Sequence, residues 1–284
     1  MIKWLTLSAA LIIAGAAAAE DGTSARKELA PTGKLRIGIL VGSLGPSTFY
    51  AVRDPATGRL RGVTVDLGAA LAKRLGVPLE FVPYPSAEAL NQSATAGEWD
   101  VTFMTVDRHR ATLVDFGPAY AVFEATYLVL PASGIRSIAD VDRAGIRVSA
   151  IREGGMALRL SQSLKNAKLV PAPTLEDAYE MLLQGKVDAI ASQRGRLKAL
   201  ASRHPDTRVL DGSFATGRQA IAVPKHRPAA LRYVCRFIEE AKASGLVRRA
   251  LDAAGVKDET VAPPEPCRSG QTGRRLRPAP PSRR

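Results

Sequence analysis

The hydrophobic positions in the first half of the chain form short apolar runs separated by stretches with helical spacing. Three apolar runs are predicted to be buried strands: 35–40, 78–82 and 100–104. Two stretches between them predict helices: 67–75 and 87–96. In the first helix Leu67, Leu71 and Leu75 recur at helical spacing, and Gly76 follows as a stop signal. Strands that alternate with helices predict a parallel sheet with helices on its faces.

The same alternation begins again near residue 126 and continues to residue 254. Further strands are predicted at 126–130, 146–151, 168–171, 187–191 and 219–224. Further helices are predicted at 156–164, 175–183, 194–202, 228–243 and 246–254. A second set of strand–helix units therefore lies inside the chain, and a hydrophobic content of 46% is enough to bury a full core.

Both ends of the chain depart from this alternation. Residues 1–19 combine an early lysine, an apolar run and, at 17–19, a cleavage site of small residues, which is typical of a secretory signal peptide. Residues 20–33 are predicted to be an N-terminal linker, and residues 257–284, rich in Pro and Arg, a disordered tail. No later run has the length of a spanning helix, so we expect a soluble protein exported to a bacterial periplasm.

The net charge of +13 does not by itself indicate nucleic-acid binding. Residues 262–284 hold six arginines and one glutamate and so supply +5, which leaves the folded part only moderately basic. A basic surface suits a protein that receives anions, because its field raises the encounter rate. The three histidines lie far apart in the sequence, so we expect no metal site and no cofactor.

The chain has two cysteines, Cys235 in a predicted helix and Cys267 in the tail. An exported protein can form a disulfide between them. A cysteine on a helix face is more often a small buried apolar group. The sequence leaves both interpretations open.

Residues 99–131 carry the strongest candidate for chemistry. An apolar strand in this stretch is followed by a polar turn with Arg110 and by a helical turn. A guanidinium at the end of a strand can hold a carboxylate with two parallel hydrogen bonds. Asp107 can cap the helical turn, because its carboxylate accepts from free amides. In a chain with 40 Lys and Arg residues, Arg110 can also be an ordinary surface arginine.

The order of several motifs resembles the extracellular solute-binding proteins of family 3, which serve amino-acid ABC transporters. In that family a strand is followed by Thr-x-Thr-x-x-Arg and then by Asp-Phe-Ser-x-Pro-Tyr. The corresponding residues are Thr105, Asp107 in place of the second threonine, Arg110, Asp115, Phe116, Gly117, Pro118 and Tyr120. Upstream, Gly62–Leu67 resembles the family's Gly-Phe-Asp-Val-Asp-Leu, with Thr64 replacing the first Asp. The resemblance extends from about Lys34 to about Gly255.

This resemblance implies an α/β fold that is periplasmic binding protein type II-like. Two α/β lobes would be joined by two crossing segments, about 120–130 and 214–224, with a ligand cleft between them. Lobe 1 would comprise residues 34–123 and 220–256, and lobe 2 residues 124–219. In such folds ligands bind at the carboxyl ends of the strands.

In lobe 1 the resemblance assigns three ligand-binding residues. Arg110 would hold the α-carboxylate of the ligand, and Thr105 would assist it. Tyr50, with Phe49 as the alternative, would lie against the ligand. An aromatic residue such as Tyr50 or Phe49, in the loop after the strand 35–40, is by default more often part of the core.

In lobe 2 the family has Gly-Thr at the start of a helix, where this chain has Glu153, Gly154 and Gly155. The hydroxyl is missing, but free amides at a helix N-terminus still favour an anion. The family also has an aspartate for the ligand ammonium, and counting from Asp188 places Gln193 at that position. Glutamine cannot neutralise a buried ammonium. Either Glu153 supplies the charge or the ligand has no ammonium.

Three functions fit these observations to different degrees. The resemblance favours a monomeric binding protein that captures an amino acid or related organic acid and delivers it to an ABC transporter permease. The alternative is a periplasmic enzyme on the same scaffold, such as a cyclohexadienyl dehydratase-like lyase, which would need an acid or base in the cleft. Only Glu153 is a candidate for that role, so we expect no enzyme. Binding to nucleic acid or to membranes through basic charge ranks last.

Overall fold

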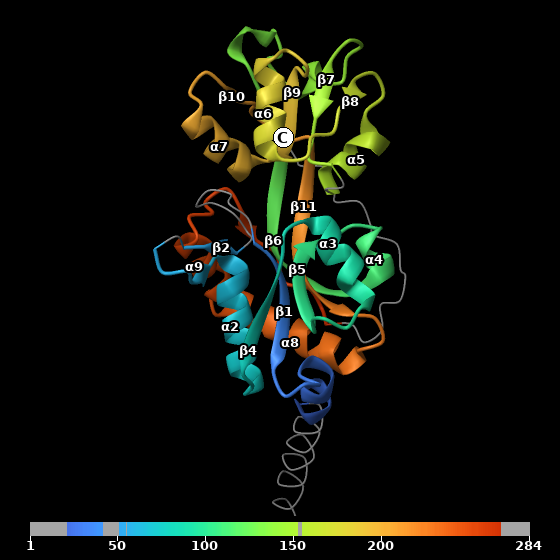
Figure 1. Cartoon of the computed structure of the whole chain (residues 1–284), viewed down its shortest axis with the longest axis vertical. Coiled ribbons are helices and arrows are strands. Elements are labelled where there is room, and N and C mark those ends of the chain that lie inside the picture. The colour runs from blue at the N-terminus through green and yellow to red at the C-terminus, as the bar shows by residue number, and fades with distance from the viewer. Residues whose placement is uncertain (1–21, 42–50, 55, 153–154, 268–284) are drawn as a thin grey trace, which may run out of the picture.

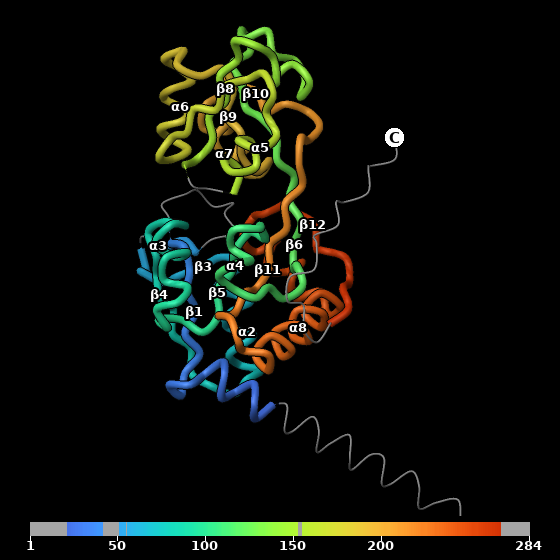
Figure 2. Tube along the Cα trace, turned by 90° about the vertical axis from the view of Figure 1, so that its right-hand side faces the viewer, coloured from blue at the N-terminus to red at the C-terminus, as the bar shows by residue number. Residues whose placement is uncertain are grey.

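The computed structural model describes residues 22–41, 51–54, 56–152 and 155–267. It forms two bodies, one above the other in Figure 1, joined by two long strands that run through both. The turned view in Figure 2 shows the same two bodies and the same connection. The expected fold of two α/β lobes with two crossing segments is confirmed.

Lobe 1, the lower body in Figure 1, contains three parallel strands covered by helices. Its strands are β1 (Leu35–Leu40), β4 (Leu79–Tyr84) and β5 (Val101–Thr105), with a small hairpin of β2 (Val52–Arg53) and β3 (Leu60–Arg61). Its helices are α2 (Val63–Leu75), α3 (Ala87–Gln92), α4 (Arg110–Leu113), α8 (Pro228–Ala243) and α9 (Leu246–Ala253). A 3₁₀ turn, Ser93–Thr95, continues α3 over most of the predicted helix 87–96.

Lobe 2, the upper body, repeats the plan on a smaller scale. Its strands are β7 (Arg147–Ser149), β8 (Lys168–Leu169), β9 (Ala189–Gln193) and β10 (Arg208–Val209). Its helices are α5 (Gly155–Ser163), α6 (Leu175–Leu183) and α7 (Arg194–Arg203), with 3₁₀ turns at Pro131–Ser133 and Ile138–Asp140. The helix α6 has the bounds that the sequence predicted, and a capping box of Thr174 and Asp177 fixes its start.

The two lobes share one sheet whose middle consists of the crossing strands. These are β6 (Val114–Val129) and β11 (Ala215–Pro224), which pair antiparallel along most of their length. The strand order is β4-β1-β5-β11-β6-β9-β7-β8, so the parallel strands of each lobe lie on opposite sides of the crossing pair. The ring of Phe123 on β6 lies against Gly217 of β11, so a Cβ at residue 217 would overlap the ring and force it to move.

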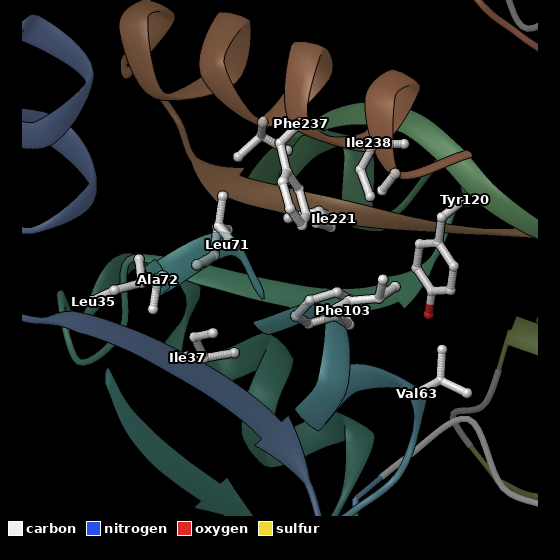
Figure 3. Packing of buried hydrophobic residues seen from close by; sticks show 14 of the residues in the cluster. Leu35, Ile37, Val63, Leu71, Ala72, Phe103, Tyr120, Ile221, Phe237 and Ile238 are labelled. Carbon is white, nitrogen blue, oxygen red and sulfur yellow. The ribbon is translucent and has the colours of Figure 1, made fainter. Parts of the chain in front are cut away.

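The hydrophobic core is divided between the lobes. The largest cluster fills lobe 1 between the sheet and the helices α2, α8 and α9, and Figure 3 shows part of it. Phe103 on β5 and Tyr120 on β6 meet edge to face, with ring centroids 5.9 Å apart. In lobe 2 two smaller clusters cover the two faces of the sheet, one including Val148 and one including Leu128. Each lobe therefore has apolar packing of its own.

The segment predicted to be a linker is partly helical. Residues 22–29 form a helix, and Ala25 and Leu29, one helical turn apart, are buried in the core of lobe 1. The Glu28 carboxylate accepts from the backbone amide of Ala230 in α8 at 2.8 Å. The prediction of a linker therefore does not hold for residues 22–29. Their apolar side chains join the core of lobe 1, and Glu28 binds the backbone of α8.

The prediction of a disordered tail does not hold for residues 257–267. The strand β12 (Thr260–Val261) pairs with β6 at Val122 and Ala121. Cys267 forms a disulfide with Cys235 of α8, with 5.7 Å between their Cα atoms. Composition alone missed this segment, because its pairing partner and its cysteine partner both lie far away in the sequence. We name residues 256–267 the C-terminal strap.

The predicted signal peptide, residues 1–19, lies outside the described residues, as does the tail from residue 268 onward. Within the described ranges, none of the helices combines the length and the apolar character that a membrane crossing requires.

Candidate ligand-binding site

The side chain of Arg110 is held at the carboxyl end of β5, where the chain turns into α4. Its Nε donates to Oδ1 of Asn91 on α3 at 3.1 Å. Its Nη1 donates to the carbonyl of Thr105 at 3.3 Å and to Oδ2 of Asp107 at 3.0 Å. The side chain is only 8% exposed, so solvent screens these contacts weakly. Arg110 is therefore a fixed, nearly buried guanidinium and not a surface arginine.

One nitrogen of this guanidinium remains available. Among the described residues no hydrogen bond is recorded for Nη2 of Arg110, while Nε and Nη1 both have acceptors. Arg110 lines a small hollow together with Asn91, Met104, Thr105 and Leu40. The hollow encloses about 10 Å³, room for about one water molecule. The hollow thus combines apolar side chains with the polar groups of Asn91 and Thr105 and a cationic donor, which suits a small anionic group.

Thr105 contributes a hydroxyl beside this hollow. Its Oγ1 accepts from Nε2 of Gln219 on the crossing strand β11 at 3.2 Å. Because that contact uses the hydroxyl as an acceptor, its own proton remains available for donation. Gln219 is 1% exposed, so the crossing strand fixes the orientation of the hydroxyl.

Asp107 faces the same guanidinium. Its Oδ1 accepts from the backbone amide of Arg110 at 2.8 Å, which confirms the predicted cap of the helical turn. Its Oδ2 forms the ion pair with Arg110 Nη1. The aspartate thus replaces a threonine of the family pattern and brings a negative charge to the site.

The first residue of α5 in lobe 2 approaches this pair from the other side. A Cβ placed on Gly155 would lie 3.7 Å from Oδ2 of Asp107 and 3.8 Å from Nη1 of Arg110. Three of the predicted site residues therefore lie close together in the structure. Arg110 and Thr105 come from lobe 1, and Gly155 comes from lobe 2.

The match to a family model decides the classification of this fold and site. The model of bacterial extracellular solute-binding proteins, family 3, matches residues 39–253. The chain belongs to this family. The match spans both lobes and includes every predicted site residue.

Curated relatives of this solute-binding protein are named as glutamine-binding proteins. The chain is similar to the glutamine-binding protein of Geobacillus stearothermophilus, with 24% identity over 201 residues, covering 68% of this chain and 74% of the relative. It is also similar to the ABC transporter glutamine-binding protein GlnH of Bacillus subtilis (strain 168), with 19% identity over 211 residues, covering 73% and 77%.

Among solved structures, the fold is similar to that of the amino acid ABC transporter substrate-binding protein AbpA of Streptococcus pneumoniae bound to L-arginine. The TM-score is 0.69 at 23% identity, and the likeness covers 82% of this chain and 100% of that chain. At this level of identity the likeness shows the fold, which is that of a two-lobed amino-acid-binding protein.

Of the remaining predicted site residues of this solute-binding protein, the structure describes Gln193. Gln193 ends β9, pairs with Ala125 of β6 and is 7% exposed. No hydrogen bond between its side chain and the Arg110 group is recorded among the described residues. Tyr50, its alternative Phe49, Glu153 and Gly154 lie outside the described residues, so the structure does not test them.

Two polar residues of the site were not predicted from the sequence. Asn91 and Gln219 hold Arg110 and Thr105, respectively, from distant elements. Neither residue belongs to a recognisable motif, and only the folded sheet brings them to the carboxyl end of β5. Within the described residues, no group of three or more His, Cys, Asp or Glu side chains is arranged to hold a metal ion.

Proposed function

We propose that the chain is the solute-binding component of an amino-acid ABC transporter. Its cleft captures a small carboxylate-bearing solute, an amino acid or a related organic acid, and the loaded protein delivers it to a permease. The observation that carries this proposal is the nearly buried guanidinium of Arg110 beside a hollow at the carboxyl end of β5, whose Nη2 has no recorded acceptor among the described residues. A buried cation of this kind is stabilised when an anion pairs with it.

The roles of the site residues follow from their donors. Arg110 Nη2 donates to the carboxylate of the ligand, and the hydroxyl of Thr105 donates to it as well. The amides at the start of α5 add a partial positive charge from lobe 2, at Gly155. Tyr50, Glu153, Gly154 and Gln193 complete the proposed site.

Closure of the lobes around the ligand is part of this proposal. Lobe 1 consists of residues 34–123 and 220–256, lobe 2 of residues 124–219, and the crossing strands β6 and β11 act as the hinge. The protein acts as a monomer in the periplasm after export through a cleavable signal peptide, residues 1–19. The permease recognises the closed form. Two curated relatives that are named as glutamine-binding proteins, one of them of an ABC transporter, support a role in transport.

A thermal-shift screen followed by calorimetry tests the proposal. L-glutamine, L-arginine and a panel of organic acids are added to the purified protein, and a bound ligand raises the unfolding midpoint by linkage. The best ligand is then titrated into the wild type, Arg110→Ala and Arg108→Ala. Arg108, two residues away and exposed, is the matched control.

We expect Arg110→Ala to lose about 2–5 kcal/mol of binding free energy, because a charge-assisted pair is removed, while Arg108→Ala binds normally. Equal affinity of the wild type and Arg110→Ala would contradict the proposal. Conversion of a prephenate-like acid to a product by the wild type would favour the lyase on the same scaffold instead.

A further inference from the structure

Asp107 is positioned where a ligand carboxylate would be expected. Its Oδ2 lies 3.0 Å from Nη1 of Arg110, and its Oδ1 accepts from the backbone amide of the same residue. The side chain of Asp107 is 18% exposed, so this contact lies largely inside the protein. The guanidinium thus already holds one carboxylate, and that carboxylate belongs to the protein.

The surroundings of Asp107 are those of an anion site. Arg110 flanks Oδ2 on one side, and the start of the nine-residue helix α5 flanks it on the other, with the Cβ position of Gly155 3.7 Å away. Amides at a helix N-terminus favour negative charge. These two groups come from different lobes, so the carboxylate of Asp107 occupies a position between the lobes.

The hydrogen bonds of Arg110 limit how a second carboxylate can bind. A bidentate carboxylate needs two neighbouring nitrogens of the guanidinium. Nε is engaged by Asn91 and Nη1 by Asp107 and Thr105, so among the residues that the structure describes only Nη2 has no recorded acceptor. A ligand can form the pair with Nη1 and Nη2 only after Asp107 releases Nη1, and the pair with Nε and Nη2 only after Asn91 releases Nε.

We propose that Asp107 sets the affinity of the site for carboxylates by competing with the ligand for Nη1 of Arg110. The inference rests on the proposed function and adds a specificity-determining residue to it. A ligand pays the cost of displacing Asp107, which a threonine at this position would not impose. Carboxylate ligands consequently bind more weakly to this chain than the guanidinium alone would allow.

Asp107→Asn is the sharpest test, because the amide oxygen can still accept from the backbone amide of Arg110 while the charge is removed. Asp107→Thr restores the residue of the family pattern. Asp115→Asn is the matched control: Asp115 also forms an ion pair, with Lys225 at 2.7 Å, and its side chain is similarly buried at 22% exposure. Asp107→Asn is also combined with Arg110→Ala.

Two probes are used, acetate as a minimal carboxylate and L-glutamine as an amino acid. In Asp107→Asn and Asp107→Thr we expect glutamine to bind about tenfold tighter than in the wild type, a change of about 1.4 kcal/mol. The stabilisation that a fixed concentration of acetate confers should rise in parallel. Asp115→Asn should match the wild type, and Asp107→Asn should give no gain when Arg110→Ala is present.

Each other result overturns the inference. Unchanged responses to both probes in Asp107→Asn would show that Asp107 does not compete. Weaker binding of glutamine with unchanged acetate would show that Asp107 receives the ligand ammonium instead. The acetate response needs no natural ligand, so it decides the inference even if every amino acid and every larger organic acid of the screen fails to bind, which is the outcome that would overturn the proposed function.

Discussion

Each lobe contains the same kind of ion pair between an arginine and an aspartate, which we call its framing pair. In lobe 1 the backbone amide and Nε of Arg36 on β1 donate to Oδ2 of Asp100 at 3.1 and 3.0 Å, and Nη2 donates to Oδ1 at 2.9 Å. In lobe 2 the same atoms of Arg147 on β7 donate to Asp188 at 2.8, 3.0 and 2.8 Å. Each aspartate directly precedes a central strand, β5 or β9, so the pair fixes the register at the amino ends of the strands.

The carboxyl ends of the same strands differ. Thr105 of β5 and Gln193 of β9 each stand five residues after the framing aspartate. At Thr105 the chain gathers a guanidinium and its acceptors, whereas Gln193 is a neutral amide. The comparison teaches that the lobes share this ion pair but differ at the carboxyl ends of these strands: among the described residues, lobe 1 has a guanidinium there, whereas lobe 2 has the neutral Gln193 and the start of α5.

The framing pairs also differ in burial. Asp100 is fully buried and receives a second arginine, Arg227, at 3.1 Å, whereas the side chain of Asp188 is 27% exposed. Hydrogen bonds from Arg147 lower the pKa of Asp188 below its ordinary value. Removing one partner of the lobe 1 pair is therefore expected to cost more free energy of unfolding, because an uncompensated charge costs more in the interior.

We expect the largest effect from a substitution that breaks the arginine–aspartate pair of lobe 1. Asp100→Asn should cost about 3–5 kcal/mol of unfolding free energy, because it leaves two arginine side chains without their buried counter-charge. Asp188→Asn, the matched change in lobe 2, should cost less, since solvent reaches that pair. Denaturant unfolding of both variants measures the difference. Equal losses would show that the two framing pairs are energetically equivalent.

The C-terminal strap is the second difference between the lobes, because the disulfide ties it to α8 of lobe 1. Replacing Cys235 and Cys267 with serine should lower the unfolding free energy by about 2–4 kcal/mol, since the open loop gains conformational entropy when unfolded.

Truncation after Ala262 removes Cys267 and also Glu265, which pairs with Arg218 of the crossing strand β11. A melting temperature of the truncated chain equal to that of the full chain would contradict this account.

The strap also carries a buried carboxyl group beside the hinge. Glu259 is 3% exposed, and burial, with the charges of Asp258 and Glu124, raises its pKa to about 9. A raised carboxyl pKa means that the folded state holds the proton more tightly, so stability from this group is present below about pH 4.5 and is lost as the pH rises towards about 9.

Glu259→Gln removes this pH dependence, because the amide does not ionise. We expect the variant to be more stable than the wild type at pH 8.5 by about 1–3 kcal/mol and nearly equal to it at pH 5. Urea unfolding at both pH values tests this. Parallel stability curves for the two proteins would show that Glu259 does not retain its proton in the folded state.

The smallest expected effect concerns the carboxyl end of β9. Gln193 lacks the charge that would neutralise a ligand ammonium, so a hydroxy or keto acid should bind at least as well as the matched amino acid. Gln193→Asp should reverse this order, with a change of about 1 kcal/mol for an interaction near the site edge. Titration of both ligands into wild type, Gln193→Asp and Glu153→Gln measures it. A preference of the wild type for the amino acid that Glu153→Gln removes would assign the ammonium to Glu153.

Much of the fold could be predicted from the sequence, because its signals are local. The strand Leu35–Leu40 and the helices Leu175–Leu183 and Pro228–Ala243 have the bounds that apolar spacing and stop signals indicate. The strap could not be predicted, because composition reports the polarity of a segment but not the distant strand with which it pairs. A partner such as β6 becomes available only after the sheet has formed.

The residues of the candidate site that belong to one segment could be predicted from their spacing, and Gly155 of lobe 2 only through the resemblance to the family. Thr105, Asp107 and Arg110 belong to one turn, so their spacing in the sequence indicates their proximity. Asn91 and Gln219 come from a helix and a crossing strand, and their place beside Arg110 depends on the strand order. The ion pair of Asp107 with Arg110 was not predicted either. The sequence indicated that Asp107 caps the helical turn, but not that its second carboxylate oxygen contacts the guanidinium.

One NMR titration tests the central claim most directly, that a carboxylate ligand binds to Arg110 in a cleft closed by lobe 2. In the labelled protein, the Nε–H of Arg110 and the backbone N–H of Gly155 are followed together while the best ligand of the screen is added. The account predicts that both resonances shift along one saturation curve, because the two groups come from opposite lobes and meet at the same ligand. Saturable binding that leaves Arg110 unshifted, or shifts that saturate at different concentrations, would contradict it.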